Sequence, residues 1–291
     1  MNGPSSQPHP LTRESVQRAH AIIAPHIHRT PLLSSRTLST ETGAGRTKLL
    51  FKWEGANRSG SFKIRGATYS VSCLSEEEAQ RGVCTQSSGN HAAALSLVAR
   101  DRGIPAYIVS PRSAPASKLA AVRSYGAQLT LCETSIDARK ATLHEVQART
   151  GAVYIPPSDA VNTMLGQGTV FLEAEQQSFE RGCGKLGAII APVGGGGLLG
   201  GIAVAAQGTG VRVFGAEPQG ADDCTRGLAE ARRFTDFVPD TIADGLLTPE
   251  IVEAQRLLWE RLKTVVEPSG AVAFAVARSA AFQALAVEGP V

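Results

Sequence analysis

One lysine of this 291-residue chain lies where its amine could become a nucleophile. Lys63 stands between Phe62 and Ile64 in the stretch SGSFKIRGA, and small residues precede it. An ammonium among apolar side chains loses hydration, which lowers the pKa of the amine and makes it reactive. The same stretch also suits the start of an amphipathic helix with a solvated lysine. Both interpretations stay open from these residues alone.

A second stretch, SSGNH at residues 87–91, combines small hydroxyls, a glycine and an amide at the turn between a predicted strand and a predicted helix. The exposed N–H groups of a helix N-terminus bind anions, so this turn suits a carboxylate. An ordinary Ser or Asn helix cap would explain one or two of these residues, but not all five.

A third stretch holds four successive glycines, Gly194 to Gly197, again between a strand and a helix. Without Cβ atoms, the backbone N–H groups can close on a phosphate. The pattern G-x-G-x-x-G also fits Gly195, Gly197 and Gly200, and Glu217 ends the next strand. A nicotinamide-dependent oxidoreductase therefore competes at this point.

Carboxylates gather after that strand, at Glu217, Asp222 and Asp223. Carboxylates this close repel one another unless water or a cation separates them, and hard oxygen ligands suit Mg²⁺ or Ca²⁺. The alternative is a solvated acidic loop.

The elements that must position these stretches alternate between strand and helix. Short apolar strands separated by helices are typical of a parallel sheet covered on both faces. We expect two such α/β units with a cleft between them, and ligands bind such sheets at the carboxyl ends of the strands. The predicted strands are 49–54, 82–85, 105–110, 127–132, 152–156, 187–193 and 211–217, and the predicted helices are 12–23, 92–102, 116–125, 136–150 and 168–179.

Composition excludes several other classes of protein. The net charge of +3 is spread along the chain without basic runs, which argues against a nucleic-acid partner. No apolar run approaches the roughly 20 residues of a membrane span, and the polar start is no signal peptide. The five cysteines are scattered without a C-x-x-C pair, so we expect reduced thiols in a cytoplasmic protein without a zinc site.

A buried lysine, a carboxylate loop and a glycine phosphate loop together suit pyridoxal phosphate chemistry. In order and wording, GSFKIRGA, SSGNHAA and PVGGGGLLGG resemble the fold-type II pyridoxal phosphate enzymes, in the branch of serine racemase and threonine/serine dehydratase. The resemblance covers about residues 31–274. It implies two doubly wound parallel-sheet domains like those of the tryptophan synthase β subunit, with the cofactor in the cleft. It implies a large domain of residues 1–78 and 160–291, a small domain of residues 79–159, and a homodimer.

The resemblance also implies roles for individual residues. Lys63 matches the Schiff-base lysine, Phe62 the residue packed on the cofactor ring, and Asn90 the partner of its phenolic oxygen. The other matches are Gly194, Gly195, Gly196, Gly197 and Leu198 for the phosphate; Gly245 and Glu267 near the ring; Ser87, Ser88, Asn90 and His91 for the substrate carboxylate; and Glu217, Ala221 (through its carbonyl) and Asp223 for a divalent cation, Mg²⁺ or Ca²⁺.

Ser88 decides between activities within the branch. Inversion at Cα needs an acid/base group on each face of the substrate, and the resemblance gives Lys63 one face and Ser88 the other. The prediction is a serine racemase that also eliminates water and ammonia from L-serine or L-threonine.

Three departures from the family pattern weaken the expected activity. The family has an additional segment after TIADGLLTPE, and it continues beyond ALAVEGPV to a final strand and a serine at the pyridine nitrogen. Ser158 stands where relatives have Asn or Asp. From these gaps we expect low turnover, and a catalytically impaired relative that acts by binding is the alternative of a different class.

Overall fold

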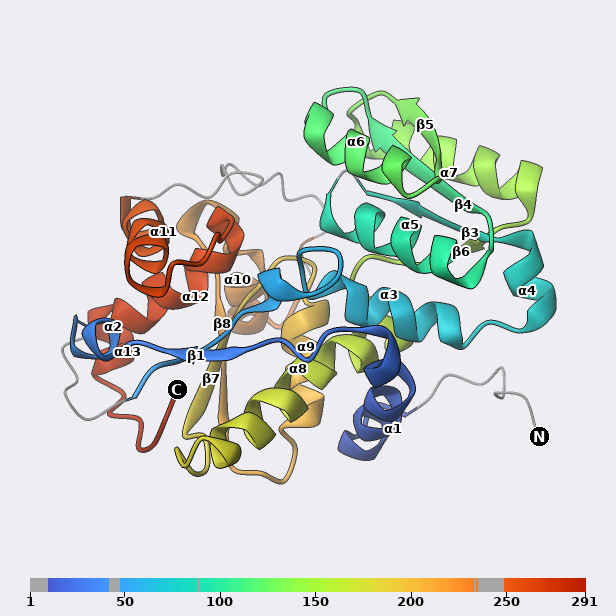
Figure 1. The fold of residues 1–291 in the computed structure, drawn as a ribbon. Coiled ribbons are helices and arrows are strands. Elements are labelled where there is room, and N and C mark those ends of the chain that lie inside the picture. The colour runs from blue at the N-terminus through green and yellow to red at the C-terminus, as the bar shows by residue number, and fades with distance from the viewer. Residues whose placement is uncertain (1–9, 42–47, 88, 233, 235–248) are drawn as a thin grey trace. The chain divides into compact units, whose positions relative to one another are not determined.

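The computed structural model describes residues 10–41, 48–87, 89–232, 234 and 249–291. The chain forms two compact units, one of residues 1–30 with 54–169 and one of residues 31–53 with 170–291. Figure 1 follows the chain through its helices and strands. The division into domains that the resemblance implies stays a prediction.

The first unit contains a four-stranded parallel sheet, as the alternating pattern predicts. Its strand order is β5-β4-β3-β6, so β3 lies between β4 and β6. The strands are β3 (Val83–Gln86), β4 (Ala106–Pro111), β5 (Gln128–Cys132) and β6 (Val153–Tyr154). Because parallel neighbours end at the same edge, the segments that follow β3 and β6 leave the sheet side by side.

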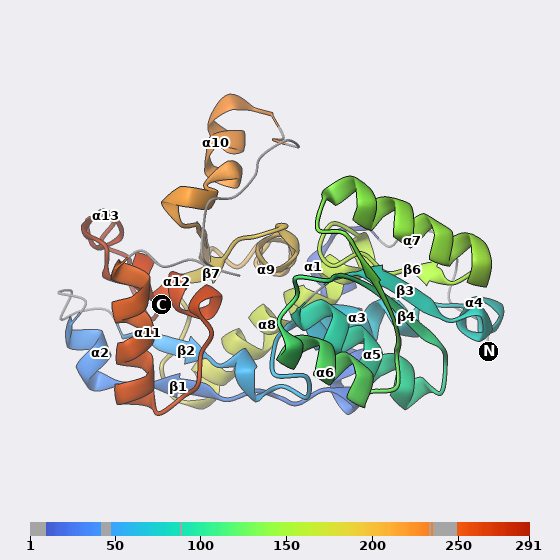
Figure 2. The ribbon, with the colours of Figure 1, turned by 90° about the horizontal axis from the view of Figure 1, so that it is seen from above.

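Alternate strand residues bury opposite faces of this sheet. Val83 and Ile108 pack with α5 (Asn90–Arg102) and α6 (Ala116–Ser124) in one cluster. Their neighbours Cys84 and Val109 pack with α7 (Ile136–Thr150) in another. Figure 2 shows α7 on one side of the strands and α5 with α6 on the other. Because successive side chains of a strand point to opposite faces of the sheet, one short apolar run can pack against helices on both faces.

Within the first unit, α3 and the N-terminal part of α8 cross at glycines. A Cβ on Gly166 of α8 (Val161–Glu180) would lie 2.6 Å from Cα of Gly66 in α3 (Lys63–Ser72). This contact explains why α8 begins at residue 161, whereas the sequence predicts a start at 168: the glycines that look like helix breakers lie inside the helix at a close approach. The unit also contains α1 (Arg13–Ile23), α4 (Glu76–Arg81) and the 3₁₀ turns Ala24–His26 and Glu54–Ala56.

The second unit has two small sheets. Strands β1 (Leu32–Ser34) and β2 (Leu50–Lys52) pair antiparallel, and β7 (Ala188–Pro192) and β8 (Arg212–Ala216) pair parallel. The N–H of Leu50 donates to Val291 O at 2.7 Å, and the N–H of Gly187 donates to Pro290 O at 2.8 Å. The last two residues therefore bond the segments at the starts of β2 and β7.

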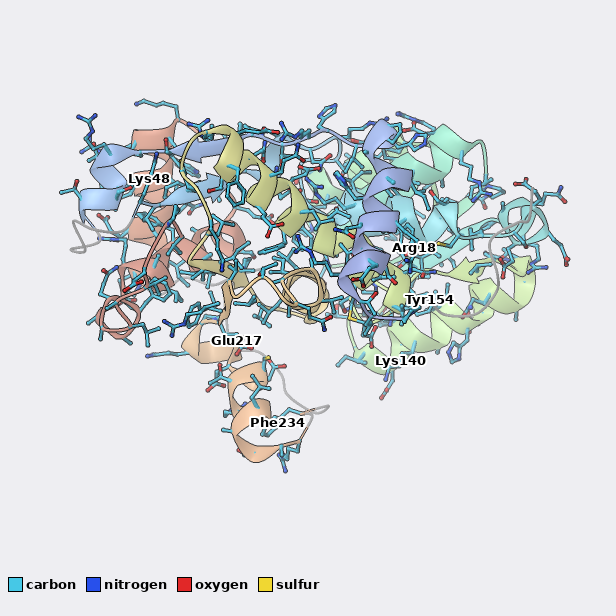
Figure 3. All side chains as sticks on the ribbon, turned by 90° about the horizontal axis from the view of Figure 1, so that it is seen from below. Arg18, Lys48, Lys140, Tyr154, Glu217 and Phe234 are labelled. Atoms are coloured by element: carbon cyan, nitrogen blue, oxygen red, sulfur yellow. The ribbon has the colours of Figure 1, made fainter. Side chains whose placement is uncertain are left out.

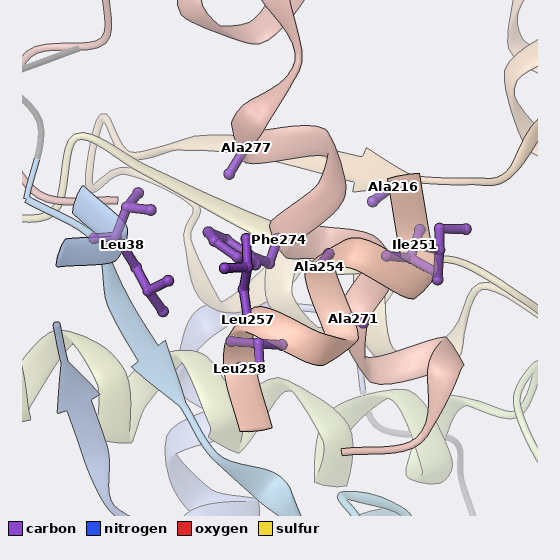
Figure 4. Close-up of a cluster of buried hydrophobic side chains, with 11 residues drawn as sticks. Leu38, Ala216, Ile251, Ala254, Leu257, Leu258, Ala271, Phe274 and Ala277 are labelled. Atoms are coloured by element: carbon purple, nitrogen blue, oxygen red, sulfur yellow. The ribbon is translucent and has the colours of Figure 1, made fainter. Parts of the chain in front are cut away.

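Helices supply most of the core of the second unit. Ile251, Ala254, Leu257 and Leu258 form the buried stripe of α11 (Pro249–Leu262), with the spacing of one helix face. They pack on Phe274 of α12 (Pro268–Arg278), as Figure 4 shows. The remaining helical segments are α2 (Arg36–Glu41), α9 (Gly197–Ala205), the 3₁₀ turn Gln219–Ala221, α10 (Asp223–Glu230) and α13 (Ala280–Gln283). Across the described ranges, no helix is long and apolar enough to span a membrane.

Candidate active site

Lys63 is the first residue of α3, and its amine is held inside the first unit. Its Nζ donates a hydrogen bond to Pro157 O at 2.6 Å and lies 5.1 Å from the centre of the Phe62 ring. Burial lowers the pKa of the Lys63 amine from 10.5 to about 8. The sequence left a buried lysine and a solvated one open, and the structure has the buried one.

A buried ion pair anchors α3 two residues further on. The guanidinium of Arg65 is fully buried and bonds both carboxylate oxygens of Glu54, at 2.7 Å and 2.8 Å. It also donates to the hydroxyl of Thr169 at 3.1 Å. Two parallel hydrogen bonds fix the orientation of a guanidinium. The start of α3, and with it Lys63, is therefore held from inside the unit.

The SSGNH stretch follows β3 and opens α5. Gly89 is the N-cap of α5 and has no side-chain capping bond, so the cap expected of an ordinary helix start is absent there. The Ser87 hydroxyl accepts from the N–H of Gly89 at 3.3 Å, and Asn90 is the first helical residue. Ser88 lies outside the described residues.

His91 points into the first unit rather than to its surface. Its imidazole is buried, and Nε2 bonds Ile155 O at 3.0 Å, just beyond the end of β6. Burial, with the nearby Lys63 amine, lowers the pKa of His91 to about 4. A neutral imidazole that donates from Nε2 leaves Nδ1 as an acceptor. Nδ1 is buried and has no hydrogen-bond partner among the described residues.

The first unit therefore brings together Lys63, Phe62, His91 and Pro157. An amine with a pKa of about 8 exchanges protons readily near neutral pH, while the imidazole stays neutral. The amine of this group can serve as a nucleophile and a base.

The glycine loop lies in the second unit, between β7 and α9. Gly196 is the N-cap of α9 with φ +79°, a conformation that favours glycine, and it has no side-chain capping bond. A Cβ on Gly194 or Gly196 would meet nothing within 4 Å. The first-turn N–H groups of a helix have no partner within the helix, so this open end, which includes Leu198, can bind an anion.

The carboxylates of the acidic stretch have partners within the second unit. The Glu217 carboxylate accepts hydrogen bonds from the N–H of Cys224 at 3.0 Å and the N–H of Thr225 at 2.7 Å, so it caps α10. Asp222 pairs with Arg226 at 2.9 Å. Figure 3 shows Glu217 at the base of α10. Among the described residues, no group of three or more His, Cys, Asp or Glu side chains is arranged to hold a metal ion.

The other expected site residues are scattered over the second unit. Ala221 ends the 3₁₀ turn before α10, Asp223 begins α10, and Glu267 is the exposed N-cap of α12. Gly245 lies outside the described residues. The structure thus places Lys63 near His91 in the first unit. The glycine loop and the acidic stretch lie in the second unit.

Two contributors to the site were missed by sequence reasoning. Pro157 acts through its backbone carbonyl, and the only signal was a Pro-Pro pair at the end of the predicted strand 152–156. Lys118 of α6 reaches the SSGNH stretch: a Cβ on Gly89 would lie 3.6 Å from its Nζ. No motif marks that lysine.

Comparisons with known proteins identify the family of this chain. The model of the family described as pyridoxal-phosphate dependent enzyme matches residues 23–249. A serine racemase of Oryza sativa subsp. indica is 40% identical, with 97% of this chain and 88% of the relative covered. A β-hydroxyaspartate dehydratase of Paracoccus denitrificans is 40% identical, with 91% of this chain and 89% of the relative covered. The solved structure of maize serine racemase superposes with a TM-score of 0.88 at 41% identity, covering 94% of this chain and 88% of that one, which confirms the predicted fold class. The chain belongs to the pyridoxal-phosphate dependent enzyme family.

Proposed function

We propose that this enzyme carries pyridoxal phosphate on Lys63 and uses it to racemise serine and to eliminate water and ammonia from L-serine or L-threonine. Family membership supports the cofactor, and relatives described as serine racemases and as a dehydratase support the two reactions. The nicotinamide alternative fails, because the glycine stretch lies within the range matched by the pyridoxal-phosphate family.

The residues present fit the cofactor. A buried amine with a pKa of about 8 suits covalent attachment to an aldehyde. The open backbone at Gly194 and Gly196, ahead of α9, suits a phosphate. The buried amine is the single observation that carries the proposal, since a solvated lysine would be charged and unreactive at neutral pH.

When bound, the cofactor supplies an electron sink that makes the proton on the substrate's Cα acidic. Lys63 then takes that proton on its amine from one face, and we assign the opposite face to Ser88. The N–H groups of Gly195, Gly197 and Leu198 would hold the phosphate. Ser87, Asn90 and His91 would orient the substrate carboxylate and the ring, with Gly245 and Glu267 beside the ring.

Substrate assays test this proposal. Cofactor-loaded protein is incubated with L-serine, D-serine and L-threonine, and both keto acid and the opposite enantiomer are measured. The expected result is racemisation of serine together with keto acid formation. If cofactor binds but neither product forms, the catalytically impaired alternative replaces the enzyme.

The Ser88→Ala variant separates the two reactions. Only the second face loses its proton donor, so racemisation should fall by ~10²–10⁴-fold while elimination from L-serine continues. An equal loss of both activities would assign Ser88 to binding of the carboxylate.

A second candidate substrate is a β-hydroxy amino acid with a further carboxylate. The Paracoccus denitrificans relative is described as a β-hydroxyaspartate dehydratase, and Lys118 brings a cation to the stretch expected to bind the substrate. An ammonium there favours a dianionic substrate over serine. The assay therefore includes 3-hydroxyaspartate. Lys118→Met should raise KM for this substrate more than KM for serine, and equal changes would remove the candidate.

Three finer predictions are part of the proposal. Glu217, Ala221 and Asp223 would bind Mg²⁺ or Ca²⁺. The support is the oxygen-rich stretch, and binding would require the Glu217 carboxylate to leave its cap on α10. If a chelator leaves the melting temperature unchanged, the proposed cation site is refuted.

We also propose a homodimer, which sedimentation tests. A cytoplasmic location is consistent with the five free thiols and is tested by fractionation.

A further inference from the structure

Three successive backbone carbonyls beyond β6 each accept a hydrogen bond from a different side chain. Ile155 O accepts from Nε2 of His91 at 3.0 Å, Pro156 O from the hydroxyl of Thr163 at 3.1 Å, and Pro157 O from Nζ of Lys63 at 2.6 Å. The donors come from α5, α8 and α3. We refer to Ile155–Pro157 as the carbonyl strip.

The carbonyl strip is stiff for reasons of sequence and pairing. Each proline ring fixes φ near −65° and removes an N–H donor, so the two prolines can offer only carbonyls. The N–H of Ile155 donates to Cys84 O at 2.9 Å, which ties the start of the strip to the central strand β3. The Thr163 hydroxyl lies 3.3 Å from that of Ser70 in α3, the same helix that begins with Lys63. The strip is thus braced against three helices and the sheet.

We propose that the carbonyl strip is a positioning element that receives the Lys63 ammonium whenever this amine is not attached to the cofactor. The inference rests on the proposed function of Lys63 and adds what keeps that amine in place. When Lys63 has taken the Cα proton, its amine becomes an ammonium with one more N–H, and the electron pair of the broken C–H bond stays with the substrate. Pro157 O offers that ammonium a fixed hydrogen-bond acceptor, and the proton stays on Nζ until Lys63 returns it to Cα.

The two effects on the Lys63 amine oppose one another. Burial disfavours the ammonium, whereas the bond to Pro157 O and the Phe62 ring favour it. Burial dominates, because the pKa is lowered to about 8. Of the titratable groups on the neighbouring elements, His91 on α5 interacts with Lys63 and is neutral, and Arg65 on α3 is paired with Glu54. Asp159, just beyond the strip, is exposed. Loosening the strip without admitting water should therefore lower the pKa of Lys63 further.

Thr163→Val tests the strip. It removes the hydroxyl that holds Pro156 O, with little change in shape, and Thr163→Ser restores the hydroxyl. The full chain, freed of cofactor, is acetylated with isotopic acetic anhydride between pH 6 and 10, and the Lys63 peptide is quantified by mass spectrometry. We expect Thr163→Val to react about threefold faster than wild type at pH 7, because a larger fraction of the amine is uncharged. Thr163→Ser should react like wild type.

A matched control removes a similar bond elsewhere in the first unit. The hydroxyl of Thr150 donates to Val146 O at 2.7 Å and accepts from the N–H of Ala152 at 3.2 Å. Neither bond involves an atom of the strip, so Thr150→Val should leave the Lys63 profile unchanged. Melting curves show whether each variant is folded, and Pro157→Ala, which keeps the carbonyl but frees its backbone, serves if Thr163→Val does not fold. The proposal is overturned if a folded strip variant leaves the pH dependence of Lys63 acetylation unchanged. It is also overturned if that dependence moves toward pH 10.5, as for a hydrated lysine. If the strip variants shift the Lys63 acetylation profile but the substrate assays detect no product, only the proposed function is overturned.

Discussion

The Lys63 region of the first unit and the glycine loop of the second are built in opposite ways. Around Lys63, side chains are buried and bonded: the amine bonds Pro157 O at 2.6 Å, and Arg65 bonds Glu54 inside the unit. At the glycine loop there are no side chains to bury, Gly194 and Gly195 are exposed, and the helix end is open.

This contrast fits the role proposed for each region. An amine becomes reactive when it loses water, which requires a packed surrounding and held partners. A phosphate keeps its charge and needs several N–H donors at once, which requires an open backbone. Substitutions in the first region should therefore change chemistry and stability, whereas those in the second should change affinity for the cofactor.

The largest effect should come from Lys63→Ala. It removes both the attachment point and the base, and loss of a general base alone lowers turnover by ~10²–10⁴-fold. Absorbance of bound cofactor and turnover of L-serine measure the two losses. Lys140→Ala, at an exposed lysine of α7, should leave both unchanged (Figure 3 shows Lys140). Normal turnover by Lys63→Ala would show that Lys63 is not needed for the reaction and would contradict the contrast between the Lys63 region and the glycine loop.

Glu54→Gln should give the largest loss of stability in the Lys63 region. It leaves the fully buried guanidinium of Arg65 without its carboxylate, which costs about 3–5 kcal/mol in the free energy of unfolding. Urea titration measures the loss. Glu77→Gln breaks an exposed pair with Arg81 and should cost about 0–1 kcal/mol. Equal costs would show that the Arg65 pair is not an internal support.

Gly196→Ala should weaken cofactor binding by about tenfold, or ~1.4 kcal/mol, since its Cβ would occupy the open space that the proposal gives to the phosphate ahead of α9. The backbone φ of +79° adds strain of about 1–2 kcal/mol. Gly208→Ala is a matched control, with φ +75° and equally open space outside the loop. Both variants should lose similar stability by thermal melting, but only Gly196→Ala should lose affinity in a cofactor titration. Equal cofactor affinities of Gly196→Ala and Gly208→Ala would show that the glycine loop does not bind the phosphate.

A further effect concerns pH and His91. Its folded-state pKa of about 4 lies below the ordinary value of 6.5, so between these values the unfolded chain binds more protons. The contribution of His91 to stability is therefore complete above pH 6.5 and is lost as the pH falls toward 4. His91→Gln should flatten this part of the stability profile, measured as urea midpoints at pH 7 and pH 4.5. His144→Gln, at an exposed histidine, should not, and identical profiles for all three proteins would refute the assignment.

Local patterns predicted much of this fold because each pattern has a local cause. The strands β4, β5 and β8 and the helix α7 lie where apolar runs and helical periods place them. The early start of α8 and its crossing with α3 were not predictable, because glycine reads as a breaker until its partner helix is known. Strand β1 is only three residues long and gives no period to detect.

The same limit applies to the candidate site. Lys63 and the glycine stretch were visible as motifs, because their chemistry depends on residue type. The carbonyl strip acts through backbone atoms, which carry no residue signature apart from the Pro-Pro pair. The capping bonds of Glu217 were also invisible, because an acidic cluster reads alike whether it binds a cation or the N–H groups of α10.

The most direct test of the account is to locate the covalent attachment of pyridoxal phosphate. The cofactor-loaded chain is reduced with borohydride and digested, and the phosphopyridoxyl group is mapped by mass spectrometry. We expect one label, on Lys63, with loss of the visible absorbance band on reduction. A label on any other lysine, such as Lys118 or Lys52, or no label on protein that turns over substrate, would contradict it.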